Sequence, residues 1–220
     1  MFITLEGPEG SGKTSQIPEL VAFLNDKGLE VVTTREPGGT AIGDQIRKIL
    51  TGMENQGLNP RSEVLLFLAA RAQLVEQVIN PALRDGRIVL CDRFGDSTIA
   101  YQGYGHGLDL QSLRTMLRFA TGGLIPDLTL LLDIPVKAGL ARKRKGQEWN
   151  RLDAYDVSFH ERVRKGYHEM AAEEPDRWVI LDASLPKEAV QVALRRAVLK
   201  VLENSESFKG KPTQSNNEVG

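Results

Sequence analysis

The feature that most constrains the fold of this chain is a glycine-rich segment near its N-terminus, Gly7-Pro8-Glu9-Gly10-Ser11-Gly12-Lys13-Thr14. It matches the pattern GxxxxGK[ST], directly follows the apolar run Phe2–Leu5, and precedes residues with helical periodicity. Glycines in such a loop let successive backbone N–H groups converge on phosphate oxygens, and the N-terminus of the next helix adds positive potential. We therefore expect this P-loop to bind a nucleoside triphosphate, with Lys13 reaching the β- and γ-phosphates and Thr14 binding Mg²⁺.

The rest of the chain alternates short apolar runs with longer segments of helical period. This alternation predicts an α/β protein, a P-loop three-layer fold whose five-stranded parallel sheet is flanked by helices. The expected strands are Phe2–Leu5, Glu30–Thr34, Ile88–Cys91, Leu128–Asp133 and Trp178–Leu181. The expected helices are about Lys13–Asp26, Ala41–Leu50, Ser62–Arg84, Leu110–Ala120, Ala154–Glu173 and Lys187–Leu202.

Length and composition indicate one domain and exclude several classes of partner. The 220 residues fit a single domain over residues 1–203, and the polar residues 204–220 are expected to form a disordered tail. A net charge of −1 provides no field for nucleic acid or an anionic membrane, and no apolar run approaches the roughly 20 residues that span a bilayer. The single Cys91 excludes a disulfide framework, and with no signal peptide evident we expect a cytoplasmic protein.

A P-loop serves motors, switches and kinases alike, so other residues must separate these classes. The chain lacks the Asn-Lys-x-Asp segment with which a GTPase reads guanine. Asp92 and Arg93 follow the third expected strand, at the edge where open α/β sheets bind ligands. Asp92 could hold Mg²⁺ or its water and Arg93 a phosphate, although an ion pair that caps the strand would give the same pattern. These features favour a kinase with a second phosphorylated substrate.

Three further segments are candidates for binding that substrate. Residues 33–40 form a stiff turn after the second strand, which could equally be structural. Phe67 and Arg71 share a helix face, so a planar base could stack on Phe67 while Arg71 donates to a ring carbonyl. A core phenylalanine beside an arginine that reaches solvent would explain the same pair. Residues 96–103 add hydroxyl and amide groups in reach of the same cleft.

The basic run at residues 142–151 is expected to lie in a mobile lid, about residues 142–152. A like-charged run is often a solvated arm. A closing lid, however, brings cations to the charge that develops on the γ-phosphoryl group and excludes water. Because residues 8–11 of the P-loop supply no cation, we expect a transition-state arginine from this run.

Together these motifs resemble the bacterial thymidylate kinase family of P-loop nucleoside monophosphate kinases, over about residues 1–202. The matching segments, in order, are EGPEGSGKT, REPGGT, FLAARAQ, DRFGDSTIAYQG and VRKGYHEMA. The resemblance implies transfer of the γ-phosphoryl group of ATP to dTMP in dTTP biosynthesis, with Mg²⁺ as cofactor, in a homodimer. The alternatives are a kinase for another pyrimidine monophosphate or a deoxynucleoside, and a regulatory module that binds nucleotide without transfer.

The resemblance also implies roles for individual residues. Glu9 would meet the deoxyribose 3′-hydroxyl, Phe67 would stack on thymine, Arg71 would donate to O4 of the base, Arg93 would bind the acceptor phosphate, and Tyr101 would crowd a ribose 2′-hydroxyl. The remaining substrate-binding residues implied are Arg35, Pro37, Ser97, Thr98 and Gln102. The implied catalytic residues are Lys13, Asp92, Arg93, Arg142 and Arg151, and the implied metal ligands are Thr14, Glu9 and Asp92.

Overall fold

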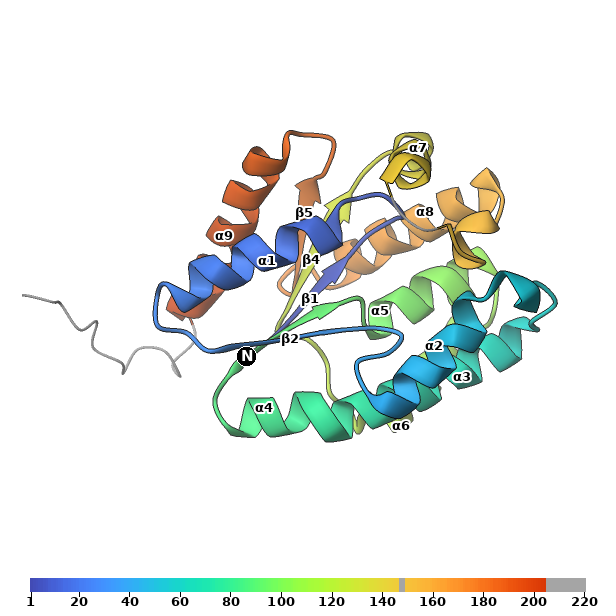
Figure 1. Cartoon of the computed structure of the whole chain (residues 1–220), viewed down its shortest axis with the longest axis horizontal. Coiled ribbons are helices and arrows are strands. Elements are labelled where there is room, and N and C mark those ends of the chain that lie inside the picture. Colours follow the sequence, from blue (N-terminus) through green and yellow to red (C-terminus); the bar gives the residue numbers. More distant parts are fainter. Residues whose placement is uncertain (147–148, 205–220) are drawn as a thin grey trace, which may run out of the picture.

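The computed structural model describes residues 1–146 and 149–204, which contain a five-stranded sheet (Figure 1). Its strands are β1 (Phe2–Glu6), β2 (Val31–Arg35), β3 (Ile88–Asp92), β4 (Leu128–Asp133) and β5 (Trp178–Asp182). They are ordered β2-β3-β1-β4-β5, and every neighbouring pair is parallel. Each predicted strand is present with ends displaced by at most one residue, so the predicted α/β class with a parallel sheet is confirmed.

Helices cover both faces of this sheet (Figure 1). They are α1 (Lys13–Asn25), α2 (Ala41–Thr51), α3 (Pro60–Leu74), α4 (Asn80–Arg84), α5 (Gly95–Thr98), α6 (Leu110–Thr121), α7 (Val136–Gly146), α8 (Val157–Glu173) and α9 (Lys187–Asn204). Helices α1 and α9 lie side by side and share an apolar core with one face. Helices α3, α6 and α8 bury the core of the opposite face. Among the described residues, no helix combines the length and apolarity needed to cross a membrane.

The long helix predicted over Ser62–Arg84 is interrupted in the structure. It begins at Pro60, where the side chain of Asn59 accepts a hydrogen bond from a backbone N–H of the first turn, and it passes through a π-helical segment, Val75–Ile79, before α4. Pro81 lies in α4, has no N–H to donate, and crowds the carbonyl one turn earlier. The wider π-helical turn directly before the proline accommodates this defect.

Other helix boundaries also differ from the sequence prediction. Residues 142–146, part of the predicted lid and outside the predicted helices, belong to α7, whose Ala, Lys and Arg residues are good helix formers. Helix α8 begins at Val157 rather than Ala154, because the Asp156 side chain accepts from the Phe159 N–H at 2.7 Å and caps the helix there. Helix α9 ends at Asn204. The remainder of the predicted tail and residues 147–148 of the predicted lid lie outside the described residues.

The segment after β3 is helical as well, although it was not among the predicted helices. Helix α5 continues into a second π-helical segment, Ile99–Gly105, which packs on α8. Because the strands are parallel, the P-loop after β1, the turn after β2 and the turn after β3 all meet at the carboxyl edge of the sheet. This edge carries the candidate site.

Candidate active site

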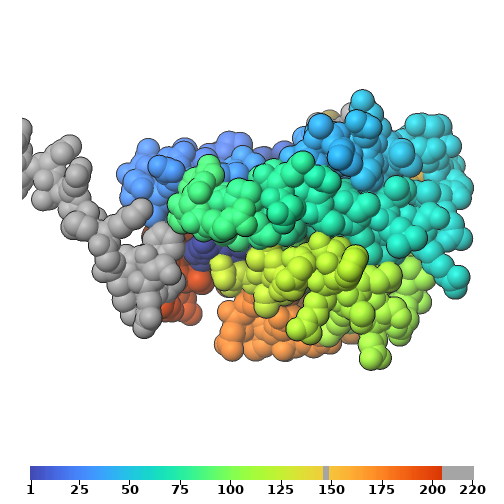
Figure 2. Space-filling view, turned by 90° about the horizontal axis from the view of Figure 1, so that it is seen from below, coloured from blue at the N-terminus to red at the C-terminus, as the bar shows by residue number. Residues whose placement is uncertain are grey.

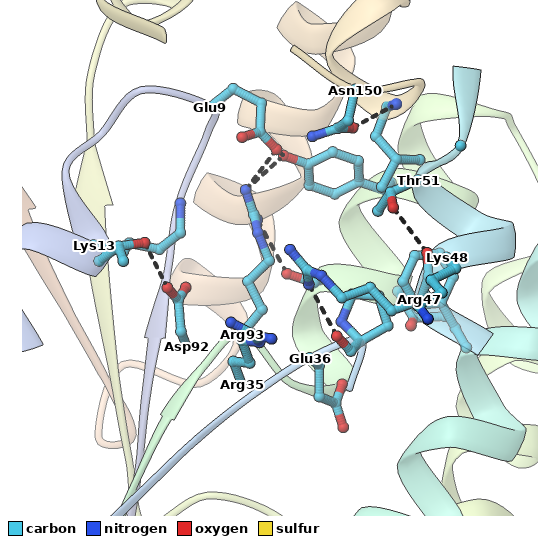
Figure 3. Close-up of a pocket in the computed structure, with 18 of the residues that line it drawn as sticks. Glu9, Lys13, Arg35, Glu36, Arg47, Lys48, Thr51, Asp92, Arg93 and Asn150 are labelled. Atoms are coloured by element: carbon cyan, nitrogen blue, oxygen red, sulfur yellow. Dashed lines mark hydrogen bonds and ion pairs between the residues drawn. The ribbon is translucent and has the colours of Figure 1, made fainter. Parts of the chain in front are cut away.

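A cavity of about 740 Å³ opens at the carboxyl edge of the sheet, and Figure 3 shows the side chains that converge on it. Of the residues proposed from the sequence, those that line it are Glu9, Gly10, Lys13, Thr14, Arg35, Pro37, Phe67, Arg71, Asp92, Arg93, Ser97, Thr98, Tyr101 and Gln102. The structure therefore brings together residues from the P-loop, the β2 turn, α3 and the segment after β3.

The P-loop lysine folds back over its own loop. Nζ of Lys13 donates to the carbonyl oxygens of Gly7 and Pro8 at 3.0 and 3.1 Å and to Ser11 Oγ at 3.1 Å. Burial and the nearby Arg93 lower the pKa of Lys13 to about 8, against the effect of the surrounding carboxylates. These carbonyl and hydroxyl oxygens hold the ammonium group of Lys13 inside the P-loop. A bound phosphate would occupy the same loop.

Two glycines of the loop occupy backbone conformations that side chains rarely adopt. Gly10 has φ of +71° and Gly12 has φ of +88°. A Cβ atom on Gly10 would also overlap the carbonyl of Gly139 in α7. The loop and α7 are therefore in direct backbone contact, which places the helix that leads into the predicted lid beside the phosphate cradle.

Two oxygen donors at the start of α1 and the end of β3 form a candidate cation site. Thr14 Oγ1 donates to Asp92 Oδ2 at 2.9 Å, and both side chains face the cavity. A hydroxyl and a carboxylate are ligands that suit Mg²⁺, which is commonly held by one or two carboxylates together with waters and substrate phosphates. The donor set therefore fits the predicted metal.

Arg93 occupies the centre of the cleft (Figure 3). Its Nη2 donates to Glu9 Oε1 at 2.7 Å and to the Tyr101 hydroxyl at 3.1 Å, and Tyr101 donates to the same Glu9 oxygen at 2.8 Å. Burial opposes ionisation of Glu9, but Arg93 and Lys13 outweigh it and lower the pKa of Glu9 to about 2. The carboxylate is therefore charged at neutral pH and holds the guanidinium group toward the P-loop.

At the other end of the cleft, Arg71 is buried rather than exposed. Its Nε donates to both carboxylate oxygens of Glu36, at 3.0 and 2.8 Å, and its Nη2 also pairs with that carboxylate. Nη1 donates to Thr98 Oγ1 at 3.0 Å. The alternative in which Arg71 reaches solvent is therefore wrong, because a carboxylate from the β2 turn compensates its charge. Phe67 is half-buried and lines the cavity beside it.

Neither predicted lid arginine lines the cavity. Arg151 is buried: Nε donates to the Leu50 carbonyl at 2.8 Å, Nη1 donates to the Tyr155 hydroxyl at 2.8 Å, and Nη2 pairs with the Glu63 carboxylate. Arg142 donates instead to the carbonyl oxygens of Ala183 and Ser184, at 2.7 and 3.3 Å.

A lysine from the same basic run does line the cavity. Lys143 lies in α7, and its Nζ is 3.6 Å from Asp153 Oδ2. Burial and the charge of Glu9 raise the pKa of Asp153 to about 6, although Lys143 acts in the opposite direction. Asn150 also faces the cavity from this side (Figure 3). The part of the cavity lined by α7 and Asn150 therefore carries a lysine where an arginine was expected.

The buried carboxylates that hold these cations were not among the residues predicted from the sequence. Glu6, Glu36 and Glu63 are each at most 6% exposed. Glu63 accepts from Gln102 Nε2 at 2.7 Å in addition to pairing with Arg151. Two signals were available. Glu6 is the only charged residue of the buried strand β1, and Glu63 precedes Phe67 by four residues, so the two lie on the same helical face. No comparable local signal identifies Glu36 as the partner of an arginine on another element.

Comparison with known proteins gives one consistent result. The thymidylate kinase family model matches residues 5–194. Thymidylate kinases from Roseiflexus sp. strain RS-1 and Herpetosiphon aurantiacus are 52% and 48% identical to the chain, in alignments that cover 86% and 90% of it and 89% and 94% of those proteins. A crystal structure of thymidylate kinase from Ehrlichia chaffeensis matches with a TM-score of 0.75 at 33% identity, covering 90% of this chain and 98% of that one.

Proposed function

This chain belongs to the thymidylate kinase family, and on that premise we propose how its cleft transfers the γ-phosphoryl group of ATP to dTMP, giving ADP and dTDP. The observation that carries the proposal is the content of one cavity, in which a P-loop lysine faces a guanidinium group and an aromatic ring lies beside a buried arginine. The two cations, Lys13 and Arg93, suit two phosphate groups that must approach each other. The ring of Phe67 beside Arg71 suits a planar base.

The donor side is the P-loop. Its backbone N–H groups and Lys13 would bind the β- and γ-phosphates of ATP. Thr14 and Asp92 would hold Mg²⁺, and Glu9 lines the same cavity. When bound there, Mg²⁺ would neutralise charge on the phosphate oxygens.

The acceptor side is centred on Arg93, which would exchange its contact with Glu9 for the phosphate of dTMP. That phosphate has a second pKa of about 6, so near pH 7 it is largely dianionic and already nucleophilic. No residue has to remove a proton from it. The site has to hold the phosphates of ATP and dTMP in line for transfer. Arg93 and Lys13 support this alignment because their positive charges offset the repulsion between the phosphates.

The base would lie between α3 and the turn after β2. Phe67 supplies an apolar face, and Nη1 of Arg71 has a second N–H beyond the one given to Thr98. A ring carbonyl such as O4 of thymine accepts this hydrogen bond, whereas the amino group of cytosine at that position does not. Arg35 and Pro37 complete the wall on the β2 side.

Lys143 is the cation best placed to meet the transferring phosphoryl group from α7. Lys143 lines the cavity, whereas Arg142 and Arg151 do not line it and instead donate to carbonyl oxygens of Ala183, Ser184 and Leu50. We therefore assign the lid cation to Lys143 in the arrangement described.

A homodimer is supported by an apolar surface that the described chain leaves uncovered. Leu65 of α3, Phe119 of α6 and Ile125 after it are 61%, 91% and 68% exposed. Helices α3 and α6 pack together, and their surfaces lie side by side on the face in Figure 2. Exposed apolar patches of this kind commonly mark protein interfaces, and a two-fold axis would bury the same patch on both copies.

The reaction is tested by measuring ADP release from ATP and Mg²⁺ with dTMP, dUMP, UMP, dCMP, AMP and thymidine offered separately. We expect a strong preference for dTMP, and a fall in kcat of about 10²-fold or more in Lys13→Ala because charge aimed at the transferring group is lost. Faster turnover of another acceptor would contradict the proposed base site. Tight ATP binding with no product from any acceptor would instead favour a regulatory module.

A further inference from the structure

Helix α8 places a tyrosine beneath the cleft that the proposed reaction does not yet use. Tyr167 belongs to the VRKGYHEMA segment and is fully buried. Its hydroxyl accepts from Arg93 Nη1 at 3.1 Å, donates to Glu6 Oε2 at 2.9 Å, and lies 2.9 Å from Ser97 Oγ. A phenolic hydroxyl has one proton to donate, and the carboxylate can take it, so the oxygen lone pairs are left for the arginine.

Glu6 anchors this arrangement to the sheet. It is the last residue of β1, and its Oε1 accepts from the backbone N–H of Phe94 at 2.7 Å. Its Oε2 accepts from Ser97 Oγ at 2.6 Å as well as from Tyr167. A buried carboxylate with these donors connects the strand before the P-loop to the turn that carries Arg93.

The backbone of Arg93 needs such support. Its φ is +70°, the only positive value among the non-glycine residues that the structure describes. A bulky residue in this left-handed region is strained, and such strain persists when surrounding contacts hold it in place. The hydrogen bond from Phe94 to Glu6 holds the peptide that follows Arg93, and Tyr167 holds its side chain.

The two ends of the Arg93 guanidinium group have different surroundings. Nη1 donates to Ser97, which also lines the cavity, and to the fully buried Tyr167, on the side of Glu6 and α8. Nη2 donates to Glu9 and Tyr101, whose side chains line the cavity. An incoming phosphate can replace the Nη2 contacts while the Nη1 contacts stay in place.

We propose that Tyr167, held by Glu6, is a positioning residue for the acceptor: it fixes the Nη1 end of Arg93 so that the Nη2 end is presented to the phosphate of dTMP. The inference rests on the proposed role of Arg93 as the residue that binds that phosphate. Preorganisation of this kind strengthens binding because the long arginine side chain is already ordered before the ligand arrives. The proposal predicts that loss of the Tyr167 hydroxyl weakens binding of dTMP, which carries the phosphate, and leaves binding of the nucleoside unchanged.

The test is to measure binding of dTMP and of thymidine, which lacks the phosphate, to wild type and to Tyr167→Phe. The substitution removes one oxygen and keeps the ring, which packs against Trp178 and Tyr101. We expect dTMP affinity to fall about tenfold, the size typical for a hydrogen bond to a charged group, with thymidine affinity unchanged. Tyr104→Phe is the matched control, because its hydroxyl bonds to Glu169 instead, and it should change neither affinity.

Arg93→Ala separates this inference from the proposed function on which it rests. That variant should reduce the preference for dTMP over thymidine, and adding Tyr167→Phe to it should cause no further loss. An unchanged preference in Arg93→Ala would overturn the role of Arg93 itself. If Arg93→Ala loses the preference but Tyr167→Phe keeps it, only the positioning role is overturned.

Two outcomes distinguish positioning from a general structural role. Equal weakening of dTMP and thymidine by Tyr167→Phe would show that the hydroxyl merely supports the fold, which overturns the inference. If Tyr167→Phe does not fold, Ser97→Ala serves as the second variant, because it removes the other acceptor at Nη1. It too should weaken dTMP more than thymidine, and equal weakening would overturn the inference.

Discussion

Arg71 and Glu36 form a buried ion pair at the base end of the cleft, with side chains 1% and 4% exposed. The pair joins α3 to the turn after β2, and Arg71 also donates to the Phe94 carbonyl at 3.1 Å. Burial raises the pKa of Glu36, and the charge of Arg71 opposes this effect. The arginine proposed to read the base is therefore also a structural element of the site.

Arg71→Ala is expected to lower the free energy of unfolding by about 3–5 kcal/mol, because Glu36 would be left as an uncompensated buried charge. In the folded fraction, dTMP should bind more weakly, and discrimination between thymine and cytosine should fall by roughly 1–3 kcal/mol. Urea unfolding and the ratio of kcat/KM for dTMP and dCMP measure the two effects.

The double variant Glu36→Gln with Arg71→Met separates recognition from stability. It removes both charges at similar volume, and replacing a whole buried pair is far less destabilising than breaking it. We expect stability to recover while discrimination stays lost, because methionine has no N–H to offer the base. Recovery of discrimination together with stability would contradict the role of Arg71 in reading thymine.

Lys143→Gln should lower kcat by about 10²-fold and change the KM for dTMP little, because the lysine is assigned to charge that develops in the transition state. Lys145→Gln is the control, since Lys145 lies on the same helix and is exposed. Steady-state kinetics of both variants provide the measurement. Similar kcat values for the two would remove Lys143 from the mechanism.

Arg151→Ala should lower the free energy of unfolding by about 3–5 kcal/mol, because the fully buried Glu63 would lose its arginine. The catalytic role expected for Arg151 from the sequence requires instead that kcat falls in protein that is still folded. Thermal unfolding and single-turnover kinetics of Arg151→Ala and Arg151→Lys separate these effects. A large loss of kcat with stability retained in Arg151→Lys would return the lid role to Arg151.

The pH dependence of stability should reveal Glu6. Burial and the charge of Asp96 raise the pKa of Glu6 from an ordinary value of 4.5 to about 7. Between these values the folded state binds more protons than the unfolded state, so the contribution of Glu6 to stability is present below about pH 4.5 and is lost as pH rises to about 7. The loss amounts to about 3 kcal/mol.

Urea unfolding of wild type and Glu6→Gln at pH 5 and pH 8 measures this effect. The wild type should lose more stability than the variant between the two values, because glutamine does not titrate. Equal losses in both proteins would show that the pKa of Glu6 is not raised by folding.

Phe119→Glu should shift a homodimer toward monomer, because it places a charge in the exposed apolar patch on α6. Sedimentation velocity over a range of concentrations measures the shift. Val192→Glu is the control, since this residue is also exposed but lies on α9, on the opposite face of the sheet. A monomeric wild type, or equal effects of the two variants, would contradict the proposed interface.

Local sequence determined much of this protein. The strand, glycine loop and helix at residues 2–25 specify the P-loop, because the backbone conformations it needs depend on glycines that are neighbours in the chain. Short apolar runs between segments of helical period placed all five strands within one residue. Parallel strands end at one edge of the sheet, so residues that follow the strands were predicted to line the cleft. Asp92, Arg93 and the start of the REPGGT turn do line it.

Only the tertiary structure decided which partners hold those residues. Arg71 pairs with Glu36 across 35 positions of the chain, Arg151 with Glu63 across 88, and Tyr167 with Glu6 across 161. The direction of a long side chain depends on the charges that distant elements place beside it. For that reason Arg151 is buried against Glu63 while Lys143 lines the cleft. Motifs in the chain select the chemistry, whereas packing between elements sets the positions of the groups that perform it.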